Sequence, residues 1–432
     1  MNRREFLTAG FGAAATLPLG ATVMPLDSRK FPSVLKETGS DAMRGRGPLI
    51  SARPYVQLLE ENEVGVVWTT SRLATGYAEW RQEGTDWHTC WMENDGFLSA
   101  NKLIHKAVLS GFDPRKPLKY RVVSREFWKL EPYLIEYVGE PESVEGELNA
   151  VLKPDGAVEF IMFNDVHSRT QIYDLLLPYA KGDYTFALFN GDIMDWTPDT
   201  EEIRRNLFAP MALVTKELKC SCWYLRGNHE TRGAAARVLR DWVMQKQDHF
   251  YGAVTIGETR FVFIDTGEDK PDATPVYGGI VDFDGYLAKQ IAWLEKEFAS
   301  PEWRNAKYRI VSQHIPPILP AKTDQFYLER MDRLVDCLAK ANITLMFCAH
   351  WHTITWFDPA PDKRRPYPII MGGGCWPERK DQKAEKLPSI VSCRIDTNGV
   401  HVKAIATNGQ TVIEKDLTTK ESPQKRGGRI ES

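Results

Sequence analysis

Five apolar runs, each followed at once by a cluster of Asp, Asn or His residues, constrain this chain more than any other feature. The runs cover residues 160–163, 186–189, 222–225, 308–312 and 345–348. The clusters after them are Asp165-Val-His167, Gly191-Asp192-Ile-Met-Asp195, Gly227-Asn228-His229-Glu230, His314 and His350-Trp-His352. Short apolar runs with such boundaries are typical of buried strands. Because ligands collect beyond the carboxyl ends of strands in open α/β sheets, the pattern predicts that these side chains meet in one site.

The side chains in these clusters are oxygen and nitrogen donors of the kind that hold divalent metals. A carboxylate has two oxygens and can span two metals roughly 3.5–4 Å apart, which is the spacing of two-metal phosphoryl-transfer sites. The clusters therefore predict a metalloenzyme. Because the same donors serve iron, zinc, manganese and magnesium (Fe, Zn, Mn, Mg), the identity of the metal stays open.

The bulk composition limits the partners and the redox chemistry. A chain of 432 residues predicts two or three domains at roughly 150 residues each. The net charge of -3, with both signs interspersed, gives no electrostatic case for binding nucleic acid or an anionic membrane surface. Seven cysteines cannot all pair within one chain, and no second Cys or His pair at zinc-site spacing accompanies Cys220 and Cys222. We expect structural cysteines.

The first 26 residues have the pattern of a targeting segment. The chain opens with Arg3-Arg4-Glu-Phe-Leu, and an apolar stretch of small residues covers 9–24. This stretch is too short and too weakly apolar for a stable membrane span. It resembles a twin-arginine (Tat) export signal, which implies the twin-arginine translocation machinery as a partner and a periplasmic or cell-envelope location. The alternative is a frayed N-terminal helix, and cleavage of the signal stays open. Residues 27–47 are read as a polar spacer.

Residues 48–140 predict a small all-β sandwich domain. Short strands are expected at 64–69, 76–80, 106–109 and 120–123, without helical periodicity between them. The segment resembles the fibronectin type III-like N-terminal domain of purple acid phosphatases in Val-Trp68-Thr, His105-Lys-Ala-Val-Leu, Gly111-Phe-x-Pro and Tyr120-Arg-Val. We expect it to pack on the enzyme domain, with carbohydrate or surface binding as the alternative role. His88 and His105 are expected at surface or strand-edge positions.

Residues 155–417 predict an α/β domain, followed by a polar tail at 418–432. Leu287, Ile291 and Leu294 share one face at helical spacing, so a helix is expected over 287–298 and another over 328–339. The five clusters, in this order, resemble the calcineurin-like metallophosphoesterase family. The resemblance implies a four-layered α/β/β/α sandwich of two mixed sheets.

The resemblance also implies a binuclear centre of two divalent or mixed-valence metal ions. It assigns seven metal ligands: Asp165, His167 and His352 to the first metal, Asn228, His314 and His350 to the second, and Asp192 to both.

Three further residues receive roles near the metals. The resemblance gives His229 the catalytic role of assisting the leaving oxygen and gives Asp195 the role of orienting His229. Arg169 is a candidate for binding the substrate phosphate through a bidentate pair, beside Asn228, with an ordinary surface arginine as the alternative. Arg226 is expected to form a structural ion pair.

The sequence departs from purple acid phosphatases at two positions. Those enzymes carry Tyr at the place of Asp195 and lack a His at the place of His167. The resemblance therefore does not imply a tyrosinate-bound ferric ion. A further departure from the wider family is Ala349, which precedes His350 where Gly is usual.

Together these features predict an exported two-metal phosphoric-ester hydrolase. The resemblance implies that a bridging hydroxide attacks phosphorus in a small phosphate-ester substrate while His229 assists the leaving group. The N-terminal resemblance favours a phosphomonoesterase. The alternatives are a phosphodiesterase acting on cyclic nucleotides or glycerophosphodiesters, and a non-catalytic metal-containing surface binding protein, which a missing ligand would favour.

Overall fold

The computed structural model describes residues 47–318, 325–374 and 382–418. The predicted export signal, nearly all of the polar spacer and nearly all of the polar tail lie outside the described residues. None of the helices within the described ranges combines the length and the apolar character needed to span a bilayer.

Two β-sheets form the middle of the catalytic domain. In the first, β10 (Val158–Phe163), β11 (Phe186–Asn190) and β12 (Ser221–Leu225) are parallel, and β19 (Ser389–Ile395), β20 (Gly399–Ala406) and β21 (Thr411–Thr418) extend the sheet antiparallel beyond β10. The second sheet has the order β13 (Gly252–Ile256), β14 (Thr259–Ile264), β15 (Tyr308–Gln313), β16 (Leu345–Cys348), β18 (Ile369–Met371), β17 (Thr355–Phe357). The five apolar runs predicted as strands coincide with β10, β11, β12, β15 and β16.

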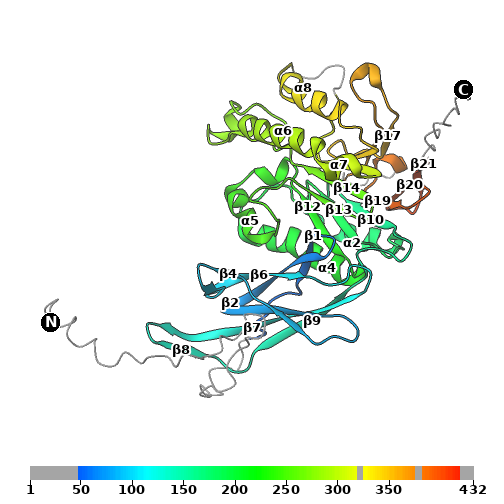
Figure 1. Ribbon diagram of the computed structural model, residues 1–432. Coiled ribbons are helices and arrows are strands. Elements are labelled where there is room, and N and C mark those ends of the chain that lie inside the picture. The colour runs from blue at the N-terminus through cyan, green and yellow to red at the C-terminus, as the bar shows by residue number, and fades with distance from the viewer. Residues whose placement is uncertain (1–46, 319–324, 375–381, 419–432) are drawn as a thin grey trace, which may run out of the picture.

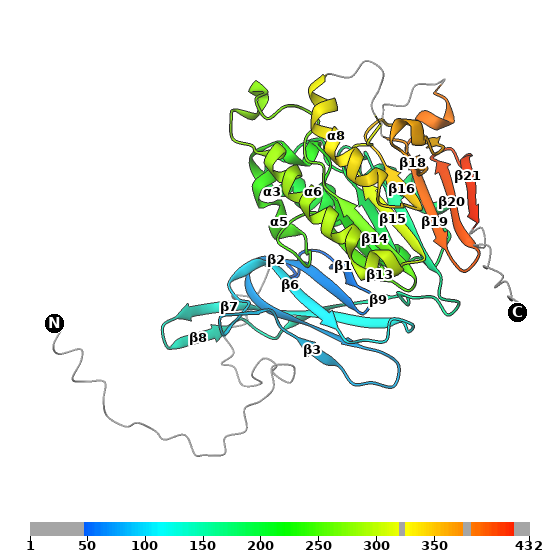
Figure 2. The same cartoon turned by 45° about the horizontal axis from the view of Figure 1, so that its top comes forward.

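Alternation of side chains along these strands produces the layers. Phe160 of β10 faces the second sheet, where its ring lies 5.7 Å from Phe261 and 4.9 Å from Phe347. Its neighbour Ile161 points the other way, into a cluster with residues of α2 (Gln171–Leu176) and α4 (Ala209–Leu218). On the outer face of the second sheet, Val262 packs with α6 (Phe283–Ala299) and α8 (Gln325–Ala339). The expected α/β/β/α fold is confirmed, and Figure 2 shows α6 and α8 over the second sheet.

Helix α6 begins where its sequence supplies a cap. Asp282 accepts a hydrogen bond from the backbone N–H of Gly285, which satisfies one of the free amides of the first turn. Leu287, Ile291 and Leu294 are buried, as the predicted apolar face requires. Helix α6 therefore contains the predicted helix and extends it by one turn at the N-terminus. Small helical segments complete the domain: α3 (Thr200–Ile203), α5 (Leu239–Trp242) and α7 (Pro301–Asn305).

A β-rich region precedes this domain. It contains β1 (Tyr55–Glu60), β2 (Glu63–Arg81), β3 (His88–Cys90), β4 (Glu93–Asn94), β5 (Phe97–Leu98), β6 (Lys102–Ser110), β7 (Leu118–Glu131), β8 (Leu134–Tyr137) and β9 (Glu142–Leu148). Two strands predicted separately are the two halves of β2. The first half pairs with β1 and β6, the second half pairs with β3 and β7, and the register shifts between Thr69 and Ala74. One long strand therefore passes through two layers.

The β-rich region joins the catalytic domain through the backbone. Strand β1 pairs in parallel with β12, with Gln57 opposite Cys222, so the first sheet runs on into the N-terminal region. Two side chains add bonds to the last residue of α5 and to the residue that follows it. The Tyr55 hydroxyl donates to the carbonyl of Trp242 at 2.7 Å, and Lys106 Nζ donates to the carbonyl of Val243 at 2.7 Å. The two domains, which are expected to pack against each other, are thus joined by one continuous sheet.

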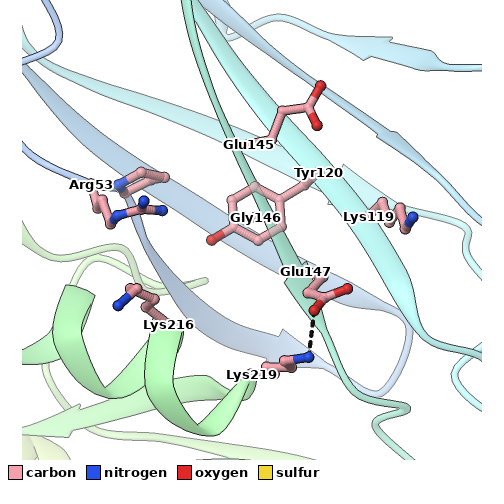
Figure 3. A pocket seen from close by; sticks show the side chains of 9 residues that line it. Arg53, Lys119, Tyr120, Glu145, Gly146, Glu147, Lys216 and Lys219 are labelled. Atoms are coloured by element: carbon pink, nitrogen blue, oxygen red, sulfur yellow. Dashed lines mark ion pairs between the residues drawn. The ribbon is translucent and has the colours of Figure 1, made fainter.

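A second junction lies where α4 leads into β12 (Figure 3). Lys219 follows α4 with a φ of 50°, forms an ion pair with Glu147 at 2.5 Å, and its carbonyl accepts from the backbone N–H of Asn149 at 2.7 Å. A hollow of about 410 Å³ between Arg53, Lys119 and these residues contains none of the predicted metal ligands. It lies at the amino end of β12, whereas the predicted site follows the carboxyl end.

The two histidines of the β-rich region differ in environment. His88 is exposed in β3, where its ring stacks on Trp80 at 4.4 Å. His105 is only 1% exposed, so the surface alternative is wrong for it. The strand-edge alternative agrees with the structure, because β6 pairs only with β2 among the described strands. The His105 ring lies 5.3 Å from Trp68, and its Nε2 is 3.0 Å from Thr70 Oγ1. The aromatic and hydroxyl neighbours allow a neutral imidazole to be buried.

The cysteines of the described ranges are all free, and four of them are buried. Burial raises the pKa of Cys222 to about 12, so the protonated thiol is favoured. These environments agree with the structural role expected from the sequence.

Candidate metal centre

Five loops bring the predicted donors to one edge of the two sheets. Asp165 follows β10, Asp192 follows β11, Asn228 follows β12, His314 follows β15 and His350 follows β16. Among the described residues the His and Asp donor atoms form three groups. Two of them share Asp192: one consists of Asp165, His167, Asp192 and His352, and the other of Asp192, His314 and His350. The third group, at the edge of the centre, consists of His167, Asp195 and His229. Within each group the donor atoms lie within 4.8 Å of one another. The six Asp and His residues among the seven predicted ligands are thus brought together in the two groups that share Asp192.

Asp165 lies at the bottom of the first group and is fully buried. Its Oδ2 accepts hydrogen bonds from Asn164 Nδ2 at 2.7 Å and from the backbone N–H of His350 at 3.0 Å. Its Oδ1 lies 3.3 Å from His352 Nε2 and 3.8 Å from His314 Nε2. One oxygen is thus fixed by the protein, and the other is directed at the imidazoles.

Asp192 has the same division between its two oxygens. Oδ1 accepts from the backbone N–H of His229 at 2.9 Å. Oδ2 lies 3.0 Å from His314 Nε2 and 3.9 Å from His167 Nε2, so it stands between the two groups. A carboxylate can span two metals through its two oxygens, but in Asp192 Oδ2 is the atom that faces both groups.

Hydrogen bonds also orient the histidines. His314 Nδ1 donates to the carbonyl oxygen of Asn190 at 2.8 Å, which leaves Nε2 as the atom directed at the centre. His167 Nδ1 lies 3.0 Å from Asp195 Oδ1, so its Nε2 is directed inward as well. An acceptor on the far nitrogen is the usual support for a metal-binding imidazole, because it fixes the tautomer and raises the basicity.

The charges of the centre are strongly coupled. Burial alone would raise the pKa of Asp192. The nearby His314 imidazole lowers this pKa by more than burial raises it, so the pKa of Asp192 lies well below the usual range. Burial lowers the pKa of His314, and the Asp192 carboxylate raises it more, to about 10. The buried carboxylates therefore favour positive charge in their midst, whether a proton or a metal carries it.

The residues present fit metal ions. Asp165 Oδ1 and Asn228 Oδ1 are buried and have no hydrogen-bond partner among the described residues. A buried polar atom without a partner costs about 1–3 kcal/mol, and these two atoms belong to opposite groups of the predicted ligand set. Coordination to one metal in each group would satisfy both atoms.

Backbone strain is concentrated at the same place. Five of the seven predicted ligands have φ values in the left-handed region: Asp165 (49°), His167 (50°), Asp192 (50°), His350 (73°) and His352 (50°). Such conformations are uncommon for residues other than Gly and cluster at functional sites, where the surrounding structure holds them. The backbone is also closely packed at Gly227, where an added Cβ atom would lie 2.2 Å from Asp192 Oδ1.

Glu230 is a residue whose role the sequence reasoning missed. Its side chain is fully buried, and its carboxylate accepts four backbone N–H groups, from Gly227 at 2.8 Å, Asp192 at 2.9 Å, Ile193 at 2.6 Å and Met194 at 3.0 Å. Burial and the nearby Asp192 raise the pKa of Glu230 to about 7, while the amide bonds oppose them. Glu230 ties the loop after β12 to the loop that carries Asp192.

Residues 158–353 match the family model described as calcineurin-like phosphoesterase. The catalytic domain belongs to this family. Among solved structures, a purple acid phosphatase (PPD1) from yellow lupin (Lupinus luteus) seeds is 13% identical with a TM-score of 0.61, covering 84% of this chain and 74% of that one. The structure of PhoD is 11% identical with a TM-score of 0.58, covering 86% and 94%. At these identities the likeness establishes the fold. No curated protein sequence matches the chain.

In this phosphoesterase site, His229 contacts Asp195 through the backbone of that residue and not through its carboxylate. His229 Nδ1 lies 2.6 Å from the backbone carbonyl oxygen of Asp195, so the carbonyl orients the ring. The Asp195 carboxylate is turned to His167, as described above. The reason is the turn at Ser168, whose Oγ accepts from the Asp195 backbone N–H at 3.0 Å and holds the residue beside His167.

The other phosphoesterase residues predicted near the substrate lie at different depths. Asn228 is 1% exposed, within the centre. Arg169 is partly exposed and stands in the turn before α2, where its backbone N–H donates to the carbonyl of Val166 at 3.1 Å. Arg226 forms an ion pair with Asp265 at 2.8 Å, which confirms its structural role.

Asp269 is a second residue that the sequence reasoning missed. It lies in the loop after β14, and its Oδ2 is 3.9 Å from His350 Nε2. Arg232 holds this loop through Glu268 at 2.5 Å and through Asp269 at 3.4 Å. An acidic residue soon after a strand is the available signal, but Asp269 lies five residues beyond the end of β14, whereas the predicted ligands follow their strands more closely.

Proposed function

We propose that this metal-dependent phosphoesterase is an exported phosphomonoesterase in which His229 assists the leaving group. The observation that carries the proposal is the pair of donor groups that share Asp192, with the His229 side chain beside them. When bound, two metal ions in these groups would supply the positive charge that polarises a phosphoester and lowers the pKa of a coordinated water.

His229 is placed for proton transfer. Because its Nδ1 is held by the Asp195 carbonyl, its Nε2 is the nitrogen that can carry a proton to the leaving oxygen. The ring is partly exposed and lies 4.6 Å from the His167 ring, so it borders the centre without facing into it. We assign substrate-phosphate contacts to Arg169 and Asn228.

The preference for monoesters is supported by the likeness to a purple acid phosphatase over both the β-rich region and the catalytic domain. To test it, purified protein loaded with metal is given nitrophenyl phosphate and bis(nitrophenyl) phosphate in parallel. We expect kcat/KM to be at least tenfold higher for the monoester. A preference for the diester would make the protein a phosphodiesterase, and no hydrolysis of either ester at full metal loading would make it a binding protein.

The export route rests on residues 1–26. The Arg3-Arg4-Glu-Phe-Leu motif and the weakly apolar stretch after it support passage through the twin-arginine machinery. Replacing Arg3 and Arg4 together by Lys keeps the charge but removes the arginine pair, so the protein should stay in the cytoplasm. Cell fractionation of both forms measures this, and unchanged export of the Lys-Lys variant would refute the route.

A further inference from the structure

The β7–β8 ribbon, defined here as residues 127–137, exposes an apolar surface far from the metal centre. The exposed fractions are 44% for Trp128, 45% for Leu130, 108% for Tyr133, 38% for Leu134 and 57% for Ile135. Single exposed apolar residues are normal, but here five lie within eight positions of one short ribbon. Figures 1 and 2 show β8 and the end of β7 projecting from the β-rich region away from the catalytic domain.

The two faces of the ribbon differ in character. Leu130 and Ile135 are directly opposite each other, so their side chains share one face. Lys129 and Glu136 are the next opposite pair, point to the other face, and form an ion pair at 3.9 Å. Leu134 is opposite Glu131 and therefore lies on the same face as this ion pair. One face of the ribbon is thus apolar at Leu130 and Ile135, and the other carries Leu134 among charged residues.

The turn of the ribbon holds Tyr133 in a left-handed backbone conformation that is unfavourable for a residue with a large side chain. Tyr133 follows Pro132 in the turn with a φ of 62°, a position where Gly or Asn is cheaper. A large side chain that is fully exposed at such a position has no packing reason within the described structure. Side-chain contacts fix the base of the ribbon: Phe127 stacks on Tyr137 at 5.2 Å, and Arg125 lies 5.2 Å above the Tyr137 ring. The apolar tip is thus held away from the body.

The start of the described chain is bound at the base of this ribbon. The backbone N–H groups of Leu49 and Ile50 donate to the Glu142 carboxylate at 2.7 and 2.9 Å, and Glu142 is opposite Ser124 in the strand that leads into the ribbon. The preceding sequence, with its apolar stretch at 9–24, therefore joins the fold on the ribbon's side.

We propose that the β7–β8 ribbon is a lipid-contacting element that inserts its apolar tip into the surface of a bilayer. Trp and Tyr with aliphatic neighbours are the composition of membrane–water interfaces. A second copy of the chain fits less well, because a stable protein interface uses about 20–30 residues on each side and the ribbon has eleven, 127–137. Since Lys129, Glu131 and Glu136 mix both signs, contact does not require anionic lipid.

Fluorescence quenching by brominated phosphatidylcholine vesicles tests the contact on the full chain. The difference between wild type and Trp128→Phe isolates the emission of Trp128, and residues 1–26 contain no Trp that could interfere. We expect brominated chains to quench this component at least twofold. Trp196, which is 54% exposed on the catalytic domain, is the matched control through Trp196→Phe, and its component should stay unquenched. Equal behaviour of the two components would overturn the proposal.

A second measurement uses flotation with the same vesicles. Changing Leu130, Tyr133 and Ile135 together to Ser should lower partitioning at least tenfold, whereas changing Val276 and Ile280, which are 67% and 69% exposed on the catalytic domain, should leave it unchanged. Adding anionic phosphatidylglycerol should alter partitioning less than threefold. Unchanged flotation of the ribbon variant would refute lipid contact. So would a dimer in sedimentation velocity that the ribbon variant abolishes while neither form binds vesicles.

Discussion

Replacing Glu230 by Gln removes the charge and one of the two acceptor oxygens from the residue that joins two ligand loops. The carboxylate receives two backbone N–H groups on each oxygen, at distances of 2.6–3.0 Å. A glutamine amide keeps one oxygen and directs an NH2 donor at the other pair of N–H groups. Two of the four hydrogen bonds are therefore lost. The two buried backbone N–H groups that made them then face the NH2 group of the glutamine, which is itself a donor.

The expected cost follows from these bonds. Hydrogen bonds to a charged group contribute about 1.5–3 kcal/mol each, so the loss of two predicts roughly 3–6 kcal/mol. Burial raises the pKa of Glu230 to about 7, so part of the charge-assisted gain is offset in the native protein. We therefore expect the lower end, about 3 kcal/mol, in the free energy of unfolding.

Urea unfolding in the presence of a chelator measures this without a contribution from bound metal. Glu217→Gln, at a glutamate whose side chain is 43% exposed and paired with Lys216, serves as the control and should change stability by less than about 0.5 kcal/mol. A loss below about 1 kcal/mol in Glu230→Gln would show that the four amide bonds do not hold the two loops together.

Other residues give separate predictions. His229→Asn should keep both metals and lose about 10²–10⁴-fold in turnover, with a smaller loss for nitrophenyl esters, and an emptied metal site would make His229 a ligand. Asp195→Asn should lower metal affinity about 10–100-fold through His167, measured by titration with zinc, and unchanged affinity would contradict that contact. Burial lowers the pKa of His105 from 6.5 to about 4. Between these two pH values the unfolded state binds a proton that the folded state does not bind, so the folded state loses stability as the pH falls. Urea unfolding from pH 6.5 to 5 should show wild type losing about 1–2 kcal/mol more than His105→Gln, and parallel losses would refute this.

The sequence predicted the centre well because each ligand follows directly after a strand. The end of a buried strand is marked by the switch from apolar to polar residues, and parallel strands deliver their carboxyl ends to one edge. The predicted ligands, from Asp165 to His352, therefore come together once the strands take their places in the two sheets. Asn228 Oδ1 and Asp165 Oδ1, which lack hydrogen-bond partners in the described structure, belong to opposite sides of the ligand set that the resemblance implies.

The direction of side chains within the loops could not be predicted in the same way. Asp195 lies three residues after Asp192, and that spacing is compatible with its carboxylate facing either His229 or His167. The left-handed conformations at Asp192 and Ser168 decide between them, and no residue type marks those positions, since neither is Gly. Glu230 was missed for a related reason, because its partners are backbone amides that leave no trace in the sequence.

The link between the two domains also has no local signature. Strand β1 pairs with β12 across a separation of more than 160 residues, with Gln57 opposite Cys222. The apolar run of β1 carries no indication of which strand it will join. The two halves of β2 were predicted as separate strands because polar residues at Ser71 and Arg72 interrupt the apolar pattern, whereas the backbone bends there and continues.

The central claim is that one chain holds two metal ions through donor groups that share Asp192. The most direct test is the metal content per chain, measured by mass spectrometry on protein reconstituted with zinc or manganese and then freed of loose metal. The account predicts two equivalents for wild type, and the loss of both in Asp192→Ala, because Asp192 Oδ2 faces both groups. One equivalent or none in folded wild-type protein, or two equivalents retained in Asp192→Ala, would contradict it.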